Sequence, residues 1–173
     1  MLNILIACDH KASREALAQT LAAQPFFHVI AICADTHAAI AITGNEQPDI
    51  VFIDGSADPL AAIEATKKIL SLSTAGVIAF SRQADISFAN HMLAAGALGY
   101  LTSRSADVEI ITAVEEVAKD NLYCCLETKY QPVPTPEHIS SFKKAISALR
   151  GNTGKKISQT IRPHWFGILN FTN

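Results

Sequence analysis

The sequence contains no long hydrophobic run, although 49% of its 173 residues are hydrophobic. The apolar stretch near the N-terminus, Leu2–Cys8, is short and interrupted. It is therefore typical neither of the apolar region of a secretory signal nor of a membrane span. We expect a cytoplasmic protein with no membrane segment.

The sequence also lacks metal-site cysteine spacing and a glycine-rich loop, and these absences argue against two classes of function. The four cysteines lack the spacing of a metal site, and two of them, Cys124 and Cys125, are adjacent, which is a poor geometry for an ordinary disulfide. We expect reduced, structural thiols. No glycine-rich loop follows the first apolar run, and this argues against an enzyme that binds nucleotides there.

Charge divides the chain into two parts. Residues 1–125 contain 7 Lys and Arg against 14 Asp and Glu, a net charge of −7, whereas residues 126–173 contain 7 against 2, a net charge of +5. The pattern indicates an acidic module followed by a basic segment, which either contacts a polyanion or forms a solvated surface.

Five apolar runs, each followed by a helix-like stretch, fill the acidic part. Nearly all-apolar strands that alternate with helices predict an α/β fold, a doubly wound parallel sheet of five strands covered on both faces. The predicted strands and helices are Leu2–Ala7 and Ser13–Ala23, Val29–Ile32 and Thr36–Thr43, Ile50–Ile53 and Ala61–Leu72, Val77–Phe80 and Ile86–Ala95, and Gly99–Leu101 and Ala106–Lys119.

The last of these helices carries the clearest local signals. Ser105 is its predicted N-cap, and acidic residues in the first turn suit the positive end of the helix. Its predicted core face consists of Val108, Ile111, Val114 and Ala118.

Polar residues stand where the predicted strands end. Asp9 follows the first strand, Asp54 ends the third, Ser81 ends the fourth, and Ser103 with Arg104 follows the fifth. Ligands of open parallel sheets bind beyond these strand ends. Asp9 and Asp54 are predicted ligands of Mg²⁺, and a carboxylate beside Mg²⁺ can attack a phosphoryl group. The alternatives are a turn-capping role for Asp54 and a solvated loop position for Asp9.

Several motifs resemble the receiver domain of response regulators of the NarL/LuxR type. The resemblance covers about residues 1–122 and implies a flavodoxin-like (CheY-like) fold. The motifs that carry it are Asn3–His10, Gln47–Asp54, Ile63–Thr66, Val77–Ser81 and Ala95–Leu101.

The resemblance implies a role for each site residue. Asp54 would be the phosphoacceptor, and Asp9, Asp54 and the backbone carbonyl of Ser56 would bind Mg²⁺. Ser81 would donate a hydrogen bond to the phosphoryl group, and Ser81 and Tyr100 would form the switch. The expected phosphodonor is a sensor histidine kinase or a small phosphodonor, and a homodimer is left open. Enzymatic activity would be limited to phosphoryl transfer to Asp54 and its hydrolysis.

Three positions depart from the family pattern. Cys8 stands where the first acidic residue of a pair is usual, so the metal site loses a carboxylate. Ala57–Pro59 replace the usual Met-Pro-Gly after the phosphoacceptor. Ser103 occupies the position of a lysine whose charge contacts the phosphoryl group, and a hydroxyl cannot replace that charge. The resemblance still predicts a two-component response regulator that accepts a phosphoryl group on Asp54 to switch a downstream output, which could be transcriptional. The departures motivate the alternative function, a phosphorylation-independent pseudo-receiver for protein interaction or dimerisation.

Beyond the predicted receiver domain (1–122), we expect a Pro-rich linker (126–136) and a short helical tail (137–173). The tail begins with an amphipathic helix, Glu137–Arg150. Gly151–Ile161 resembles the turn and second helix of a LuxR-type helix-turn-helix, but the recognition helix has no counterpart. We therefore do not expect the tail to bind DNA as a complete domain.

Overall fold

The computed structural model describes residues 1–125, so the predictions for the linker and the tail lie outside the described residues. Within 1–125 the strands form one parallel sheet in the order β2-β1-β3-β4-β5-β6. The strands are β1 (Leu2–Ala7), β2 (Phe27–Cys33), β3 (Ile50–Asp54), β4 (Gly76–Ser81), β5 (Gly99–Thr102) and β6 (Tyr123–Cys124).

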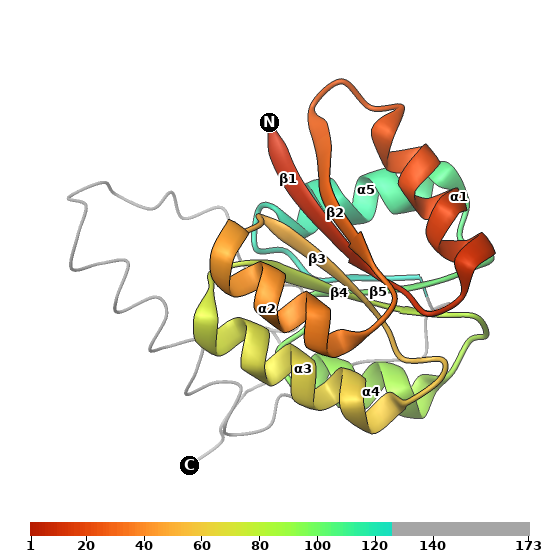
Figure 1. The fold of residues 1–173 in the computed structure, drawn as a ribbon. Helices are drawn as coiled ribbons and strands as arrows, with labels where there is room; N and C mark the ends of the chain where they lie inside the picture. The colour runs from red at the N-terminus through yellow and green to blue at the C-terminus, as the bar shows by residue number, and fades with distance from the viewer. Residues whose placement is uncertain (126–173) are drawn as a thin grey trace, which may run out of the picture. The chain divides into compact units, whose positions relative to one another are not determined.

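Helices alternate with the strands and cover both faces of the sheet (Figure 1). They are α1 (Lys11–Ala22), α2 (Thr36–Glu46), α3 (Pro59–Leu72), α4 (Ile86–Ala94) and α5 (Asp107–Val117). Helices α1 and α5 lie on one face, and α2, α3 and α4 lie on the other. The predicted doubly wound α/β fold is confirmed.

The core consists of two apolar layers, one on each face of the sheet. Side chains alternate along each strand, so Leu5 and Val51 pack beneath α2–α4 while Ile4 and Phe52 pack beneath α1 and α5. Because both faces are covered, these strands are apolar at nearly every position, which explains why the sequence pattern reveals them.

Aspartate residues are the N-caps of three helices. Asp35, Asp58 and Asp85 accept hydrogen bonds from backbone N–H groups in the first turns of α2, α3 and α4, over 2.8, 3.0 and 2.9 Å. Each cap satisfies a donor that the helix leaves free. All three helices therefore start with a negative charge at the edge where the parallel strands end.

The predicted start of α5 is wrong in detail. Its N-cap is Ala106, whose N–H donates to the Glu109 side chain over 2.8 Å, whereas the Ser105 hydroxyl accepts from the N–H of Thr102 over 3.2 Å. Asp107 accepts from the Thr20 hydroxyl over 2.9 Å, and this contact ties the first turn of α5 to α1.

The predicted core face of α5 is also wrong in part. Val114 is buried as expected, but Val108 is 67% exposed. The buried residues of the helix are Ile110, Ala113, Val114 and Val117. The true apolar stripe is therefore rotated from the predicted one.

A short sixth strand adds to the five that were predicted. Residues Tyr123 and Cys124 pair in parallel with Gly99 and Tyr100 of β5. Two residues are too few for a periodic pattern, so the sequence gives no signal for this strand.

Gly55, directly after β3, is required by close packing. A Cβ atom at this position would lie 2.0 Å from the Phe88 ring of α4. The glycine thus lets α4 approach the end of β3. Among the described helices, none has the length and hydropathy needed to cross a membrane.

Candidate functional site

The carboxyl ends of the central strands bring the predicted site residues to one edge of the sheet. Asp54 is the last residue of β3, and the next N–H, of Gly55, donates to the Phe80 carbonyl of β4 over 3.1 Å. Ser81 ends β4, and its carbonyl accepts from the N–H of Ser103 over 2.9 Å. Asp54, Ser81 and Ser103 therefore follow one another across neighbouring strand ends.

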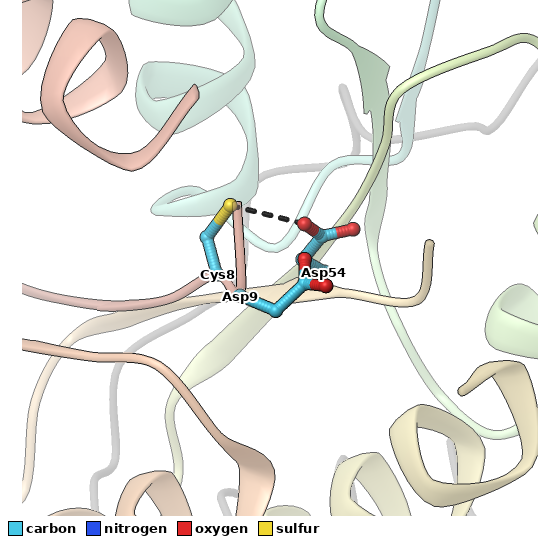
Figure 2. Close-up of side chains that lie close together, drawn as sticks. All are labelled: Cys8, Asp9 and Asp54. Atoms are coloured by element: carbon cyan, nitrogen blue, oxygen red, sulfur yellow. Dashed lines mark hydrogen bonds between the residues drawn. The ribbon is translucent and has the colours of Figure 1, made fainter. Parts of the chain in front are cut away.

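Both carboxylate oxygens of Asp54 accept hydrogen bonds. Oδ1 accepts from the N–H of Ser56 over 2.8 Å, and Oδ2 accepts from the thiol of Cys8 over 3.0 Å (Figure 2). Asp9 points toward the same place from the loop after β1. The Asp54 side chain is therefore held by its own loop and by the residue that follows β1.

The Cys8 side chain is protonated at neutral pH. Burial, followed by the hydrogen bond and negative charge of Asp54, raises the pKa of this thiol from 9.0 to about 12. The residue is 1% exposed. Where a second acidic residue would add negative charge, this chain places a neutral hydrogen-bond donor.

Asp9 is influenced by charges of both signs. Desolvation, followed by the neighbouring Asp54 carboxyl, raises the pKa of Asp9, whereas the positive charge of Arg82 acts to lower it. The loop that carries Asp9 is fixed by Arg14, whose Nη1 donates to the carbonyls of Cys8 and Asp9 over 2.6 and 3.1 Å.

The cluster can hold a metal ion through its carboxylates. One ligand atom from each of Cys8, Asp9 and Asp54 lies within 4.8 Å of the others. The oxygens of the two aspartates fit a small, hard divalent cation. The protonated sulfur of Cys8 does not belong to that ligand class, so the fit rests on the two carboxylates.

Ser81 and Tyr100 are brought together, as the switch hypothesis requires. The Tyr100 hydroxyl lies 2.7 Å from Ser81 Oγ, and Ser81 Oγ donates to the Gln83 carbonyl over 2.6 Å. Tyr100 is fully buried, and its hydroxyl accepts from the N–H of Asp85 over 3.0 Å. The aromatic side chain therefore links β5 to the start of α4.

Ser103, at the expected lysine position, bonds to a neighbouring loop. Its hydroxyl donates to the Arg82 carbonyl over 2.8 Å, and the N–H of Arg82 donates to Ser56 Oγ over 2.9 Å. Sequence reasoning missed Arg82, although its position directly after Ser81 at a strand end was a signal that could have revealed it.

A cleft of about 960 Å³ opens beside these residues. It is lined by the loops after β3, β4 and β5, including Ser56, Ser81, Arg82, Ser103 and Arg104. The two arginines give this cleft positive charge next to the acidic cluster.

A known family accounts for this arrangement. The sequence profile of the response regulator receiver domain matches residues 4–115. The chain belongs to this family. This match, together with the relatives and the LuxR-family structure described next, confirms the resemblance to NarL/LuxR-type receiver domains and the fold that it implies.

Proteins similar in sequence to this chain include transcriptional regulatory proteins. The chain is 30% identical over 147 residues to the transcriptional regulatory protein DegU of Brevibacillus brevis, covering 84% of this chain and 60% of the relative. It is 32% identical over 120 residues to the transcriptional regulatory protein LiaR of Bacillus subtilis (strain 168), covering 69% and 57%. The chain thus spans somewhat more than half the length of these relatives.

Solved structures share the fold. A two-component response regulator of the LuxR family from Aurantimonas sp. SI85-9A1 superposes with a TM-score of 0.66 at 24% identity, covering 85% of this chain and 99% of the other. At this identity the likeness supports the fold, and the roles of individual residues remain predictions.

Proposed function

We propose that this receiver domain accepts a phosphoryl group on Asp54 and thereby switches a downstream output in two-component signal transduction. The observation that carries the proposal is the position of the Asp54 carboxylate, at the end of β3, in one cluster with Asp9. The expected donor is the phosphohistidine of a sensor histidine kinase or a small molecule such as acetyl phosphate.

The transfer exchanges one bond to phosphorus for another. A carboxylate oxygen of Asp54 bonds to phosphorus while the bond from phosphorus to the donor atom breaks, and its electron pair leaves with that atom. Water later attacks the phosphorus, releasing inorganic phosphate and restoring the carboxylate. The domain would have no other enzymatic activity.

Asp9, Asp54 and the backbone carbonyl of Ser56 would hold Mg²⁺. When bound, Mg²⁺ supplies positive charge that neutralises the phosphoryl oxygens. The Ser81 hydroxyl would leave Gln83 to donate to a phosphoryl oxygen, and the contact between Ser81 and Tyr100 would report that movement to the start of α4.

The neutral Cys8 thiol modifies this site. Because it donates to Asp54 Oδ2, the thiol takes one of the acceptor positions of that oxygen. We expect weaker Mg²⁺ binding than with a carboxylate at this position, because one negative charge is missing.

The output would be transcriptional, because the relatives DegU and LiaR are named transcriptional regulatory proteins. Those relatives also support a phosphorylated regulator over a phosphorylation-independent interaction module. A cytoplasmic location, where bacterial transcription takes place, belongs to this proposal, and homodimerisation is an arrangement it allows.

The test is labelling of the full chain by acetyl phosphate with Mg²⁺, followed by intact-mass measurement. We expect a mass gain of one phosphoryl group that is lost in Asp54→Asn and without Mg²⁺. Asp58→Asn is the matched control, since asparagine also caps helices and this residue lies outside the metal cluster. A folded wild-type chain that neither gains mass nor binds beryllofluoride would support the pseudo-receiver instead.

A further inference from the structure

The proposed phosphorylation puts a new negative group into an acidic environment. Asp9 and Asp54 lie together, and the capping carboxylates of Asp58 and Asp85 begin neighbouring helices at the same edge of the sheet. Ser103 carries no charge, and its hydroxyl is engaged by the Arg82 carbonyl at 2.8 Å. Beyond the charge that Mg²⁺ would supply, any positive charge that the protein itself contributes must therefore come from a side chain other than Ser103.

The backbone of Arg82 is fixed beside the acceptor. Its N–H donates to Ser56 Oγ over 2.9 Å, and its carbonyl accepts from Ser103 Oγ over 2.8 Å. It directly follows Ser81 at the end of β4, whose last residues pair with the end of β3. The hydroxyls of Ser56 and Ser103 thus hold the Arg82 backbone, from which the side chain starts, between the loops after β3 and β5.

The guanidinium of Arg82 is available for a ligand. The side chain is exposed and lines the cleft, and among the described residues it forms no hydrogen bond or ion pair. Arg14 is committed to the carbonyls of Cys8 and Asp9.

We propose that Arg82 supplies the positive charge that stabilises the phosphoryl group on Asp54, in place of the lysine that related receivers carry at the position of Ser103. The proposal rests on the proposed phosphorylation of Asp54. Guanidinium is always charged and donates paired hydrogen bonds, which suits phosphoryl oxygens. Arg82 forms no covalent bond in the transfer, and its contact with the phosphoryl oxygens strengthens as they gain charge.

The test compares labelling rates of full-length variants with acetyl phosphate and Mg²⁺, together with beryllofluoride binding followed by ¹⁹F NMR. A charge-assisted hydrogen bond contributes about 1.5–3 kcal/mol, so Arg82→Gln should lower the labelling rate by roughly 10- to 100-fold. Arg104→Gln removes the same charge from the same cleft and should stay within about twofold of wild type. Adding Ser103→Lys to Arg82→Gln should restore much of the loss.

Arg82→Lys keeps the positive charge, so its labelling rate should fall less than that of Arg82→Gln. This variant keeps the inference testable if Arg82→Gln does not fold. The inference is overturned if wild type is labelled and Arg82→Gln matches it, or if Arg104→Gln causes an equal loss. If wild type is neither labelled nor binds beryllofluoride while Ser103→Lys does both, Arg82 does not replace the lysine. If neither protein reacts, the proposed function itself fails, and the inference fails with it.

Discussion

Replacing Cys8 by aspartate gives the sharpest test of the electrostatics at the acceptor. In wild type a neutral thiol contacts Asp54 Oδ2 at 3.0 Å. The variant would place a third carboxylate in a cluster whose ligand atoms lie within 4.8 Å of one another. We therefore expect Cys8→Asp to be strongly destabilised without metal and to be partly rescued by Mg²⁺.

The magnitude follows from these distances. At 4.8 Å and an effective dielectric constant of about 20, the new carboxylate repels each of Asp9 and Asp54 by about 3 kcal/mol, or about 6 kcal/mol for the two pairs. For a chain of this length, 1 kcal/mol corresponds to roughly 3 °C in Tm, so the variant should melt about 20 °C lower than wild type in EDTA. Mg²⁺ at 100 times its Kd adds about 2.7 kcal/mol, which recovers nearly half of the loss.

Differential scanning calorimetry of the full chain, with EDTA and with Mg²⁺, measures both effects. Cys33→Asp is the control, because Cys33 ends the neighbouring strand and lies outside the cluster. The reasoning is refuted if Cys8→Asp melts with wild type in EDTA, or if Mg²⁺ raises the Tm of the two variants equally.

Three further predictions concern packing and protonation. Because burial and Asp54 raise the pKa of Cys8 from 9.0 to about 12, its thiolate fraction at pH 8 is about 1000-fold smaller than that of an ordinary thiol. Iodoacetamide should therefore alkylate Cys8 of the native protein slowly, and the alkylation rate should rise with pH up to about pH 12. Peptide mass spectrometry measures this rate, and rapid alkylation at pH 8 would contradict the prediction. Gly55→Ala forces a Cβ to within 2.0 Å of an aromatic ring and should cost about 1–3 kcal/mol in urea unfolding, whereas Gly44→Ala has open space in α2 and should be neutral or stabilising. Tyr100→Phe removes a buried hydroxyl with three hydrogen-bonding partners and should cost about 1–2 kcal/mol, and equal stability would argue against those bonds.

Sequence alone could predict the strands because each is buried on both faces. Ile50–Ile53, for example, is apolar at every position, and β3 extends it by only one residue, Asp54. The location of Asp54 at a strand end follows from this pattern. Helix boundaries and rotations do not follow from the sequence in the same way. Val108 is exposed because tertiary contacts decide which side of α5 faces the sheet.

Contacts between distant residues could not be predicted in this way. The bond from Cys8 to Asp54 joins residues 46 positions apart, and nothing in either local sequence indicates that a thiol would face the carboxylate. Sequence reasoning did not identify Arg82 because the family pattern marks only the position of Ser103, where the lysine charge is missing. Only the folded loops show that the two residues are bonded to each other.

The backbone of Arg82 has a mechanical consequence. Through the hydroxyls of Ser56 and Ser103, it connects the loops after β3, β4 and β5, which are far apart in the sequence. The Arg82 N–H donates to Ser56 Oγ, so the Arg82 amide should exchange its hydrogen at a rate set by the opening of the contact between the loops after β3 and β4. The loops after β3, β4 and β5 would then open together rather than independently.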